Sequence, residues 1–170
     1  MSSPRPPEGT LEIGPPRRSR PRSSLRRLTL WNALLVILQV AVGMVVNLYV
    51  RVPAHHPGAQ PSEYFSGSLR SVGWAIGSGL PALMLHPALE LAVGAMALVL
   101  AVRAVANFGG WVAALSVLAA AMIIGAGFNG ASFLDFGAAL SSLLMSLLAL
   151  GSLACYAVCS HLLGSGPPSR

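Results

Sequence analysis

Two ionisable residues, His86 and Glu90, lie four positions apart inside an apolar run over residues 82–102. On a helix this spacing places both side chains on one face, within reach of each other. If the run enters a bilayer near Ala82, Glu90 lies about 12 Å below the boundary, at ~1.5 Å per residue. An ionisable group at that depth is costly unless it is neutral or paired. We therefore expect Glu90 to be neutral or hydrogen-bonded to His86.

Three amide side chains could extend this pair into a larger polar site. Gln39 lies within the first apolar run, while Asn47 and Asn129 end the first and third runs on the same side as His86. Intramembrane polar residues commonly mark a ligand or proton site. The alternative is a set of structural hydrogen bonds that lock two helices together. The sequence leaves both interpretations open.

The composition indicates that lipid surrounds the elements that carry these residues. Of the 170 residues, 54% are hydrophobic and 9% are charged, which is too little charge to cover a small soluble domain. A helix needs about 20 apolar residues to cross the ~30 Å hydrocarbon layer. Four runs approach that length, at about 30–50, 82–102, 111–128 and 138–163. They predict an all-α, polytopic membrane domain over residues 28–163, folded as an up-down-up-down four-helix bundle.

The remaining segments are read as connections and tails. Residues 51–72 should form a polar outer loop, and residues 73–80 either lie in the membrane interface or extend the next helix. Residues 129–137 should form a short turn. The Pro-, Ser- and Arg-rich tail at 1–27 and the tail at 164–170 should be disordered, because neither can bury enough apolar surface.

All eleven basic residues are arginines, and their distribution predicts the orientation. Nine fall in the two tails and the 103–110 connection, against two on the opposite side. The positive-inside rule then places both termini in the cytoplasm, with the protein in the plasma membrane. Nucleic-acid binding is not expected, because the arginines do not lie on an amphipathic helix or strand of the kind that contacts nucleic acid. The cluster ahead of the first span should instead bind the lipid surface; its members are Arg17, Arg18, Arg20, Arg22, Arg26 and Arg27.

Residues 38–47 (LQVAVGMVVN) and 86–94 (HPALELAVG) resemble half of a heme A synthase. In that family each half is a four-helix bundle, in which a helix with an apolar Gln-x-x-x-Gly run precedes one that opens with a histidine near the outer face. The resemblance implies a heme site with His86 as an axial ligand to the iron. The chain also resembles small uncharacterised four-span membrane proteins of actinobacteria, a likeness that implies no activity.

Three functions follow from these observations. The first is a non-enzymatic accessory or assembly subunit of a membrane complex, held to a membrane-protein partner or a second copy of itself. The second is a heme-binding redox or heme-handling protein that uses His86. The third is a small proton-coupled carrier that uses Glu90. An enzyme is less expected, because no nucleotide-binding, zinc-protease or nucleophile-elbow motif occurs.

Overall fold

The computed structural model describes residues 19–78 and 80–165, with side chains from Arg22 onward. Four of its helices are long and apolar enough to cross a membrane, and no strand occurs in the described residues. This architecture confirms the predicted all-α, four-helix membrane bundle. The four long helices are α1 (Ser19–Tyr49), α3 (Pro81–Asn107), α4 (Gly110–Phe136) and α5 (Ala139–Gly164).

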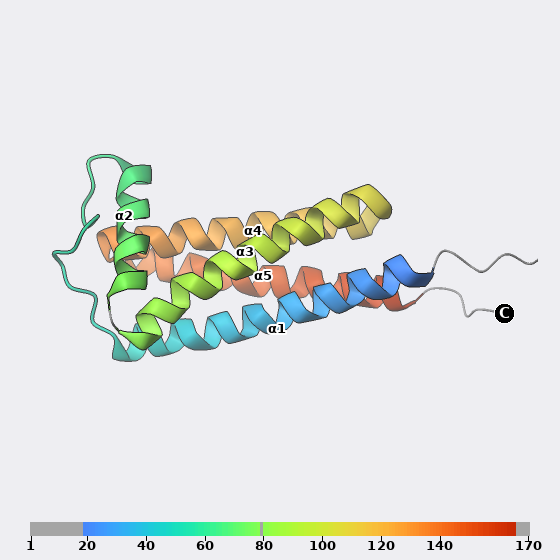
Figure 1. Cartoon of the computed structure of the whole chain (residues 1–170), viewed down its shortest axis with the longest axis horizontal. Coiled ribbons are helices and arrows are strands. Elements are labelled where there is room, and N and C mark those ends of the chain that lie inside the picture. The colour runs from blue at the N-terminus through green and yellow to red at the C-terminus, as the bar shows by residue number, and fades with distance from the viewer. Residues whose placement is uncertain (1–18, 79, 166–170) are drawn as a thin grey trace, which may run out of the picture.

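The four long helices form a ring in chain order. Each helix packs against its neighbours in sequence, and α5 closes the ring against α1. Short connections force α3, α4 and α5 to alternate in direction, as Figure 1 shows. The Arg22 guanidinium near the start of α1 donates to the Leu162 carbonyl near the end of α5, at 3.0 Å. The first and last helices therefore begin and end on the same side, here called the terminal end; the opposite side is the loop end.

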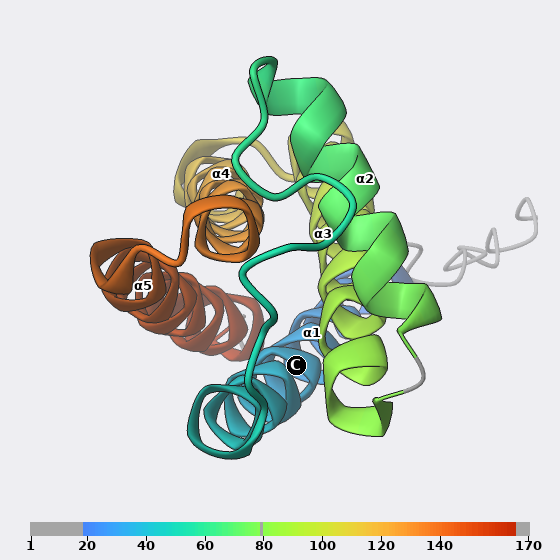
Figure 2. The same cartoon turned by 90° about the vertical axis from the view of Figure 1, so that its left-hand side faces the viewer.

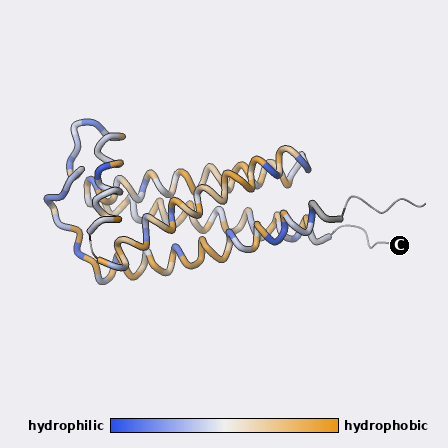
Figure 3. The backbone as a smooth tube through the Cα atoms, viewed as in Figure 1, coloured by the Kyte–Doolittle hydropathy of each residue, from blue (hydrophilic) through white to orange (hydrophobic). Residues whose placement is uncertain are grey.

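Small residues fill the centre of the ring and large apolar residues cover its outside. Ala97, Ala104 and Ala119 are fully buried, whereas leucine, valine and isoleucine side chains are exposed along all four helices. Figure 3 shows that hydrophobic residues predominate along the four long helices. Lipid gives no hydrophobic drive for helix association, so close backbone approach over small residues must hold the helices together.

A fifth helix, α2 (Tyr64–Gly77), corrects the prediction of a loop over residues 51–72. It runs across the loop end, over α3 and α4 (Figures 1 and 2). Its buried side consists of Gly67, Ser68, Ser71 and Ala75, while Phe65 and Leu69 are exposed. The buried side is thus small and polar. Its apolar residues Phe65, Leu69 and Val72 recur at helical spacing, a pattern typical of an interfacial helix that the loop prediction overlooked.

Helix α4 is longer than its predicted span of 111–128 and removes most of the predicted turn at 129–137. It continues to Phe136 and ends at Gly137, whose φ of 66° provides the left-handed cap typical of glycine. Asn129 does not break the helix, because its Nδ2 donates to the Gly125 carbonyl one turn earlier, at 2.8 Å.

Helix α1 also starts earlier than expected, so residues 19–27 of the predicted disordered tail are helical. Arginine is a good helix former, and Pro21 falls in the first turn, where its missing N–H costs little. The rest of that tail, including Arg17 and Arg18, lies outside the described residues, as do residues 166–170.

Asp135 near the end of α4 holds α2 in place. Its carboxylate is almost completely buried, at 2% exposure. It accepts hydrogen bonds from the hydroxyls of Ser68 at 2.8 Å and Ser71 at 2.5 Å. The backbone N–H of Gln60 donates to the backbone carbonyl of Asp135 at 2.9 Å and ties the preceding loop to the same point. Hydrogen bonds to a charged group are stronger than neutral ones, so this contact fixes α2 across the loop end.

Replacing Asp135 by alanine should loosen α2 while leaving the four long helices inserted. The two serine hydroxyls would be left buried without an acceptor, a loss of about 1–3 kcal/mol in docking free energy. Hydrogen–deuterium exchange of the α2 amides in nanodiscs should accelerate in Asp135→Ala. Glu63→Ala is the matched control, because Glu63 is an exposed carboxylate next to the same helix. Equal exchange in the two variants would contradict the assigned role of Asp135.

Candidate functional site

A cavity of about 330 Å³ lies in the loop-end half of the bundle and is lined by residues of all five helices. We call it the main cavity. His86 and Glu90 of α3 are the ionisable residues of its lining, and most of the rest is apolar. Phe65 and Leu69 of α2 and Phe128 of α4 belong to the lining and are also exposed on the surface of the bundle. The main cavity therefore reaches the apolar, lipid-facing surface.

A second, smaller cavity of about 90 Å³ adjoins the first and extends toward the middle of the bundle. We call it the side cavity. It contains Gln39 and shares Gly43, His86 and Glu90 with the main cavity. Glu90 lies nine residues into α3, at a depth of ~14 Å along the helix axis. The polar residues thus sit where the two cavities meet, well below the loop end.

Gln39 joins α1 to α3 at this junction. Its Nε2 donates to the carboxylate of Glu90 at 2.7 Å and to the backbone carbonyl of His86 at 3.0 Å, and its side chain is only 5% exposed. Both partners are acceptors, so the amide nitrogen must face them. Glu90 is therefore paired with Gln39, and the described residues show no His86–Glu90 hydrogen bond of the kind expected from their spacing.

The ring of His86 packs against the backbone of α1 at Gly43. A Cβ atom added at Gly43 would lie 2.8 Å from Cε1 of His86, closer than ordinary contacts allow. Only glycine therefore lets the ring occupy this position. Nδ1 of His86 is buried and has no hydrogen-bond partner of standard geometry among the described residues. A buried ring nitrogen without a partner is costly. His86 therefore has a ring nitrogen whose hydrogen bond is not made within the described part of the protein.

Glu90 extends toward α4 at a second glycine. A Cβ atom at Gly127 would lie 3.5 Å from Oε1 of Glu90, and Gly127 also lines the main cavity. The other carboxylate oxygen, Oε2, is the one that accepts from Gln39. Oε1 therefore remains available at the cavity, without a donor among the described residues.

The structure brings Gln39, His86 and Glu90 together, whereas the two predicted asparagines have different positions. Asn47 lines both cavities from the end of α1 and is exposed. Asn129 bonds to its own helix at Gly125 and lines neither cavity. Gln39, Asn47, His86 and Glu90 therefore form the candidate site, and Asn129 is better explained as part of α4.

The predicted lipid-binding arginines are described only in part. Arg26 and Arg27 are exposed at the terminal end, and Arg22 bonds to the end of α5. Arg17, Arg18 and the side chain of Arg20 lie outside the described residues. Arg26 and Arg27 therefore lie at the end of the bundle where they can contact a charged lipid surface.

Two of the buried polar contacts that were not predicted involve Asn32 and Asp135. Asn32 of α1 is completely buried and its Nδ2 donates to the hydroxyl of Tyr156 on α5, at 2.9 Å. Asp135 and its two serine donors form the second contact. A polar residue inside an apolar span is a signal that could have drawn attention to Asn32. Nothing local in the sequence indicates that Ser68 and Ser71 face Asp135.

The residues around His86 do not fit a heme. Bis-histidine ligation needs a second histidine, yet His86 is the only histidine that lines either cavity. In the connection before α2, His55 is exposed, and His56 stacks on Trp74 with its Nε2 in contact with the Leu134 carbonyl. His161 lies in the last turn of α5, at the terminal end. No arginine lines the main or the side cavity, so the two propionates of a heme would meet Glu90 rather than a cation.

Comparison of the chain with protein-family models, with characterised proteins and with solved structures finds no match. The likeness to heme A synthase therefore rests on residues 38–47 and 86–94 alone, and it remains a resemblance of sequence pattern.

Replacing Gly43 by alanine should displace the ring of His86 and lower thermal stability, because overpacking typically costs about 1–3 kcal/mol. Gly94→Ala on α3 is the control, since an added Cβ there meets nothing within 4 Å. Thermal unfolding in detergent followed by circular dichroism measures both effects. His86→Ala should restore the melting temperature of Gly43→Ala, because the three atoms nearest the new Cβ all belong to His86. A double variant as unstable as the single one would contradict this packing.

Proposed function

We propose that this integral membrane protein binds an amphipathic molecule in the main cavity and takes it up sideways from the surrounding lipid. The observation that carries the proposal is the lining of this cavity, which is apolar and lipid-accessible at Phe65, Leu69 and Phe128 and polar at His86 and Glu90. A volume of about 330 Å³ falls within the range of small-molecule sites, roughly 300–1,000 Å³. A ligand with an apolar body and one polar group matches such a lining.

The arginine distribution supports a location of the main cavity in the outer leaflet of the plasma membrane. The terminal end carries Arg22, Arg26 and Arg27, and Arg103 lies near the same end of α3. Basic residues are retained on the cytoplasmic side of membranes. The loop end, with α2 and both cavities, then faces outward. Ligand would reach the main cavity from the outer leaflet.

Packing in the terminal half of the bundle favours ligand binding over passage through the protein. The lining of the side cavity extends to Val36, Val93 and Ala149. Beyond that level, buried residues fill the bundle, among them Asn32, Tyr156 and Leu100. A carrier that uses Glu90 would have to open this packed half, so binding is the simpler role. Membership of a larger membrane complex stays a prediction, compatible with a subunit that holds a ligand for a partner.

Cysteines introduced at the two ends test the orientation. His55→Cys should react with a membrane-impermeant maleimide in intact cells, whereas Ser165→Cys should react only after the membrane is opened. Both positions are exposed, and the native Cys155 and Cys159 are buried, so background labelling should be low. Labelling of Ser165→Cys in intact cells would place the cavities on the cytoplasmic side instead.

A photoreactive long-chain alkanol tests ligand binding. In nanodiscs, a probe with its diazirine in the chain should crosslink to peptides from α2, α3 and α4 that line the main cavity. Gly127→Leu should reduce this labelling at least several-fold, because its side chain would project into the cavity beside Glu90.

Gly94→Leu is the matched control for Gly127→Leu, since Gly94 lines neither cavity and has open space around it. It should label like the native protein. Crosslinking spread evenly along the lipid-facing helices, unaffected by Gly127→Leu, would overturn the proposed function.

A further inference from the structure

We infer that the molecule bound in the main cavity is a primary amine, an amphiphile whose ammonium group donates a hydrogen bond to Glu90 beside the ring of His86. The inference rests on the proposed function and specifies its ligand class. It follows from the unequal numbers of donors and acceptors at the junction of the two cavities. The charges and the apolar surfaces around them support the same class.

Acceptors outnumber donors at the junction. Both N–H groups of the Gln39 amide face acceptors, Glu90 Oε2 and the His86 carbonyl. Its Oε1 is buried and has no donor, and Oε1 of Glu90 also lacks one among the described residues. A neutral histidine contributes one more acceptor and one donor. Of these groups, Oε1 of Glu90 borders the main cavity, whereas Oε1 of Gln39 and Nδ1 of His86 are buried out of reach of a ligand. A primary ammonium carries three N–H donors and could donate one to Oε1 of Glu90.

The balance of charge points the same way. Glu90 is the only acidic residue in the lining of the main and side cavities, and no arginine accompanies it there. A carboxylate at this depth in a membrane is costly unless a cation is near. A bound ammonium would supply that cation. An anionic or phosphate-bearing headgroup would instead add a second negative charge beside Glu90, so a phospholipid is a poor fit.

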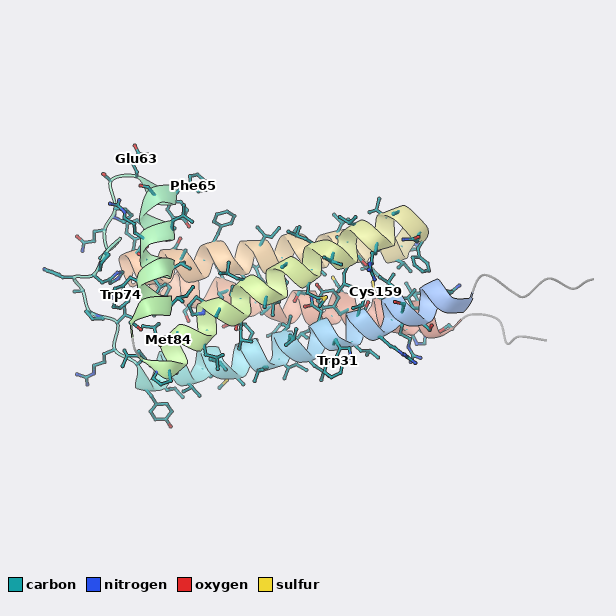
Figure 4. All side chains as sticks on the ribbon, in the orientation of Figure 1. Trp31, Glu63, Phe65, Trp74, Met84 and Cys159 are labelled. Carbon is teal, nitrogen blue, oxygen red and sulfur yellow. The ribbon has the colours of Figure 1, made fainter. Side chains whose placement is uncertain are left out.

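The rest of the lining suits a hydrocarbon tail. From His86 and Glu90 the main cavity extends past Leu91 and Ile124 toward the aromatic pair Phe65 and Phe128. These two rings meet edge to face, with centroids 6.1 Å apart. Figure 4 shows Phe65 projecting from α2 on the side of the bundle. A single tail can therefore run from the polar junction under α2 to the lipid.

Competition against the photoreactive alkanol tests the ligand class. Nanodiscs containing the native protein would be titrated with an alkylamine, an alkyltrimethylammonium salt, an alkanoic acid and phosphatidylethanolamine of matched chain length. The primary amine should compete at a concentration on the order of tenfold lower than the other competitors. That factor is the gain in affinity expected from one charge-assisted hydrogen bond. The trimethylammonium salt carries the same charge but no N–H donor, and it should compete more weakly.

Substitutions at Glu90 and Gln39 test which side chains cause the preference for a primary amine. Glu90→Gln keeps the shape of the side chain and should remove most of the amine preference while leaving alkanol labelling in place. Gln39→Leu should reduce the preference and also weaken the α1–α3 contact, so its melting temperature is measured in parallel. Asn129→Leu is the control, because Asn129 lines neither cavity, and it should retain the preference.

The outcomes separate this inference from the proposed function. Alkanol labelling of the main cavity with equal competition by amine, acid and alkanol would overturn the amine inference and leave ligand binding intact. Equal competition by the amine and the trimethylammonium salt would overturn the hydrogen-bonding part, leaving charge as the cause. An amine preference that persists in Glu90→Gln would remove Glu90 from its role. The absence of any cavity labelling would overturn both proposals.

Discussion

Polar groups inside a hydrocarbon layer must find partners within the protein, and this constraint accounts for the main contacts of the bundle. Such contacts occur at several levels of the bundle. Asp135 binds α2 at the loop end, Gln39 binds α3 in the middle, and Asn32 binds Tyr156 of α5 nearer the terminal end. Each contact joins segments that are far apart in the sequence. Together they fix which helices are neighbours where apolar packing alone would allow sliding or rotation.

Glycine determines where the bundle is open and where it is closed. At Gly43 the missing side chain lets the His86 ring lie against α1, and at Gly127 it leaves space beside Glu90. In the terminal half, alanines such as Ala104 and Ala119 allow close contact and leave the interior filled. The same use of small residues therefore gives tight packing in one half and a cavity in the other.

Helix α2 has an unusual distribution of side chains for a surface helix. Its polar serines face the protein and its large apolar residues face outward, which is the arrangement suited to a helix at a membrane interface. The Asp135 contact holds it over α3 and α4, where Phe65 and Leu69 contribute to the main cavity. The apolar wall of the proposed ligand site therefore depends on the contact of Ser68 and Ser71 with Asp135, and Ser68 itself also lines the main cavity. Figure 2 shows how α2 and its preceding connection cover this end of the ring.

The sequence by itself determined the membrane setting, the four spans and their alternating order, because hydrophobic length and charge shortage are local properties. It also indicated a polar site at Gln39, His86 and Glu90, since polar residues in apolar runs are visible without a structure. Only the tertiary structure decided that Glu90 pairs with Gln39, at a separation of 51 residues, instead of with His86 one turn away. It also decided that the helix at residues 64–77 lies across α3 and α4, because its polar side is satisfied by Asp135 from a distant segment. Such pairings depend on which helices become neighbours, and no local pattern of residues carries that information.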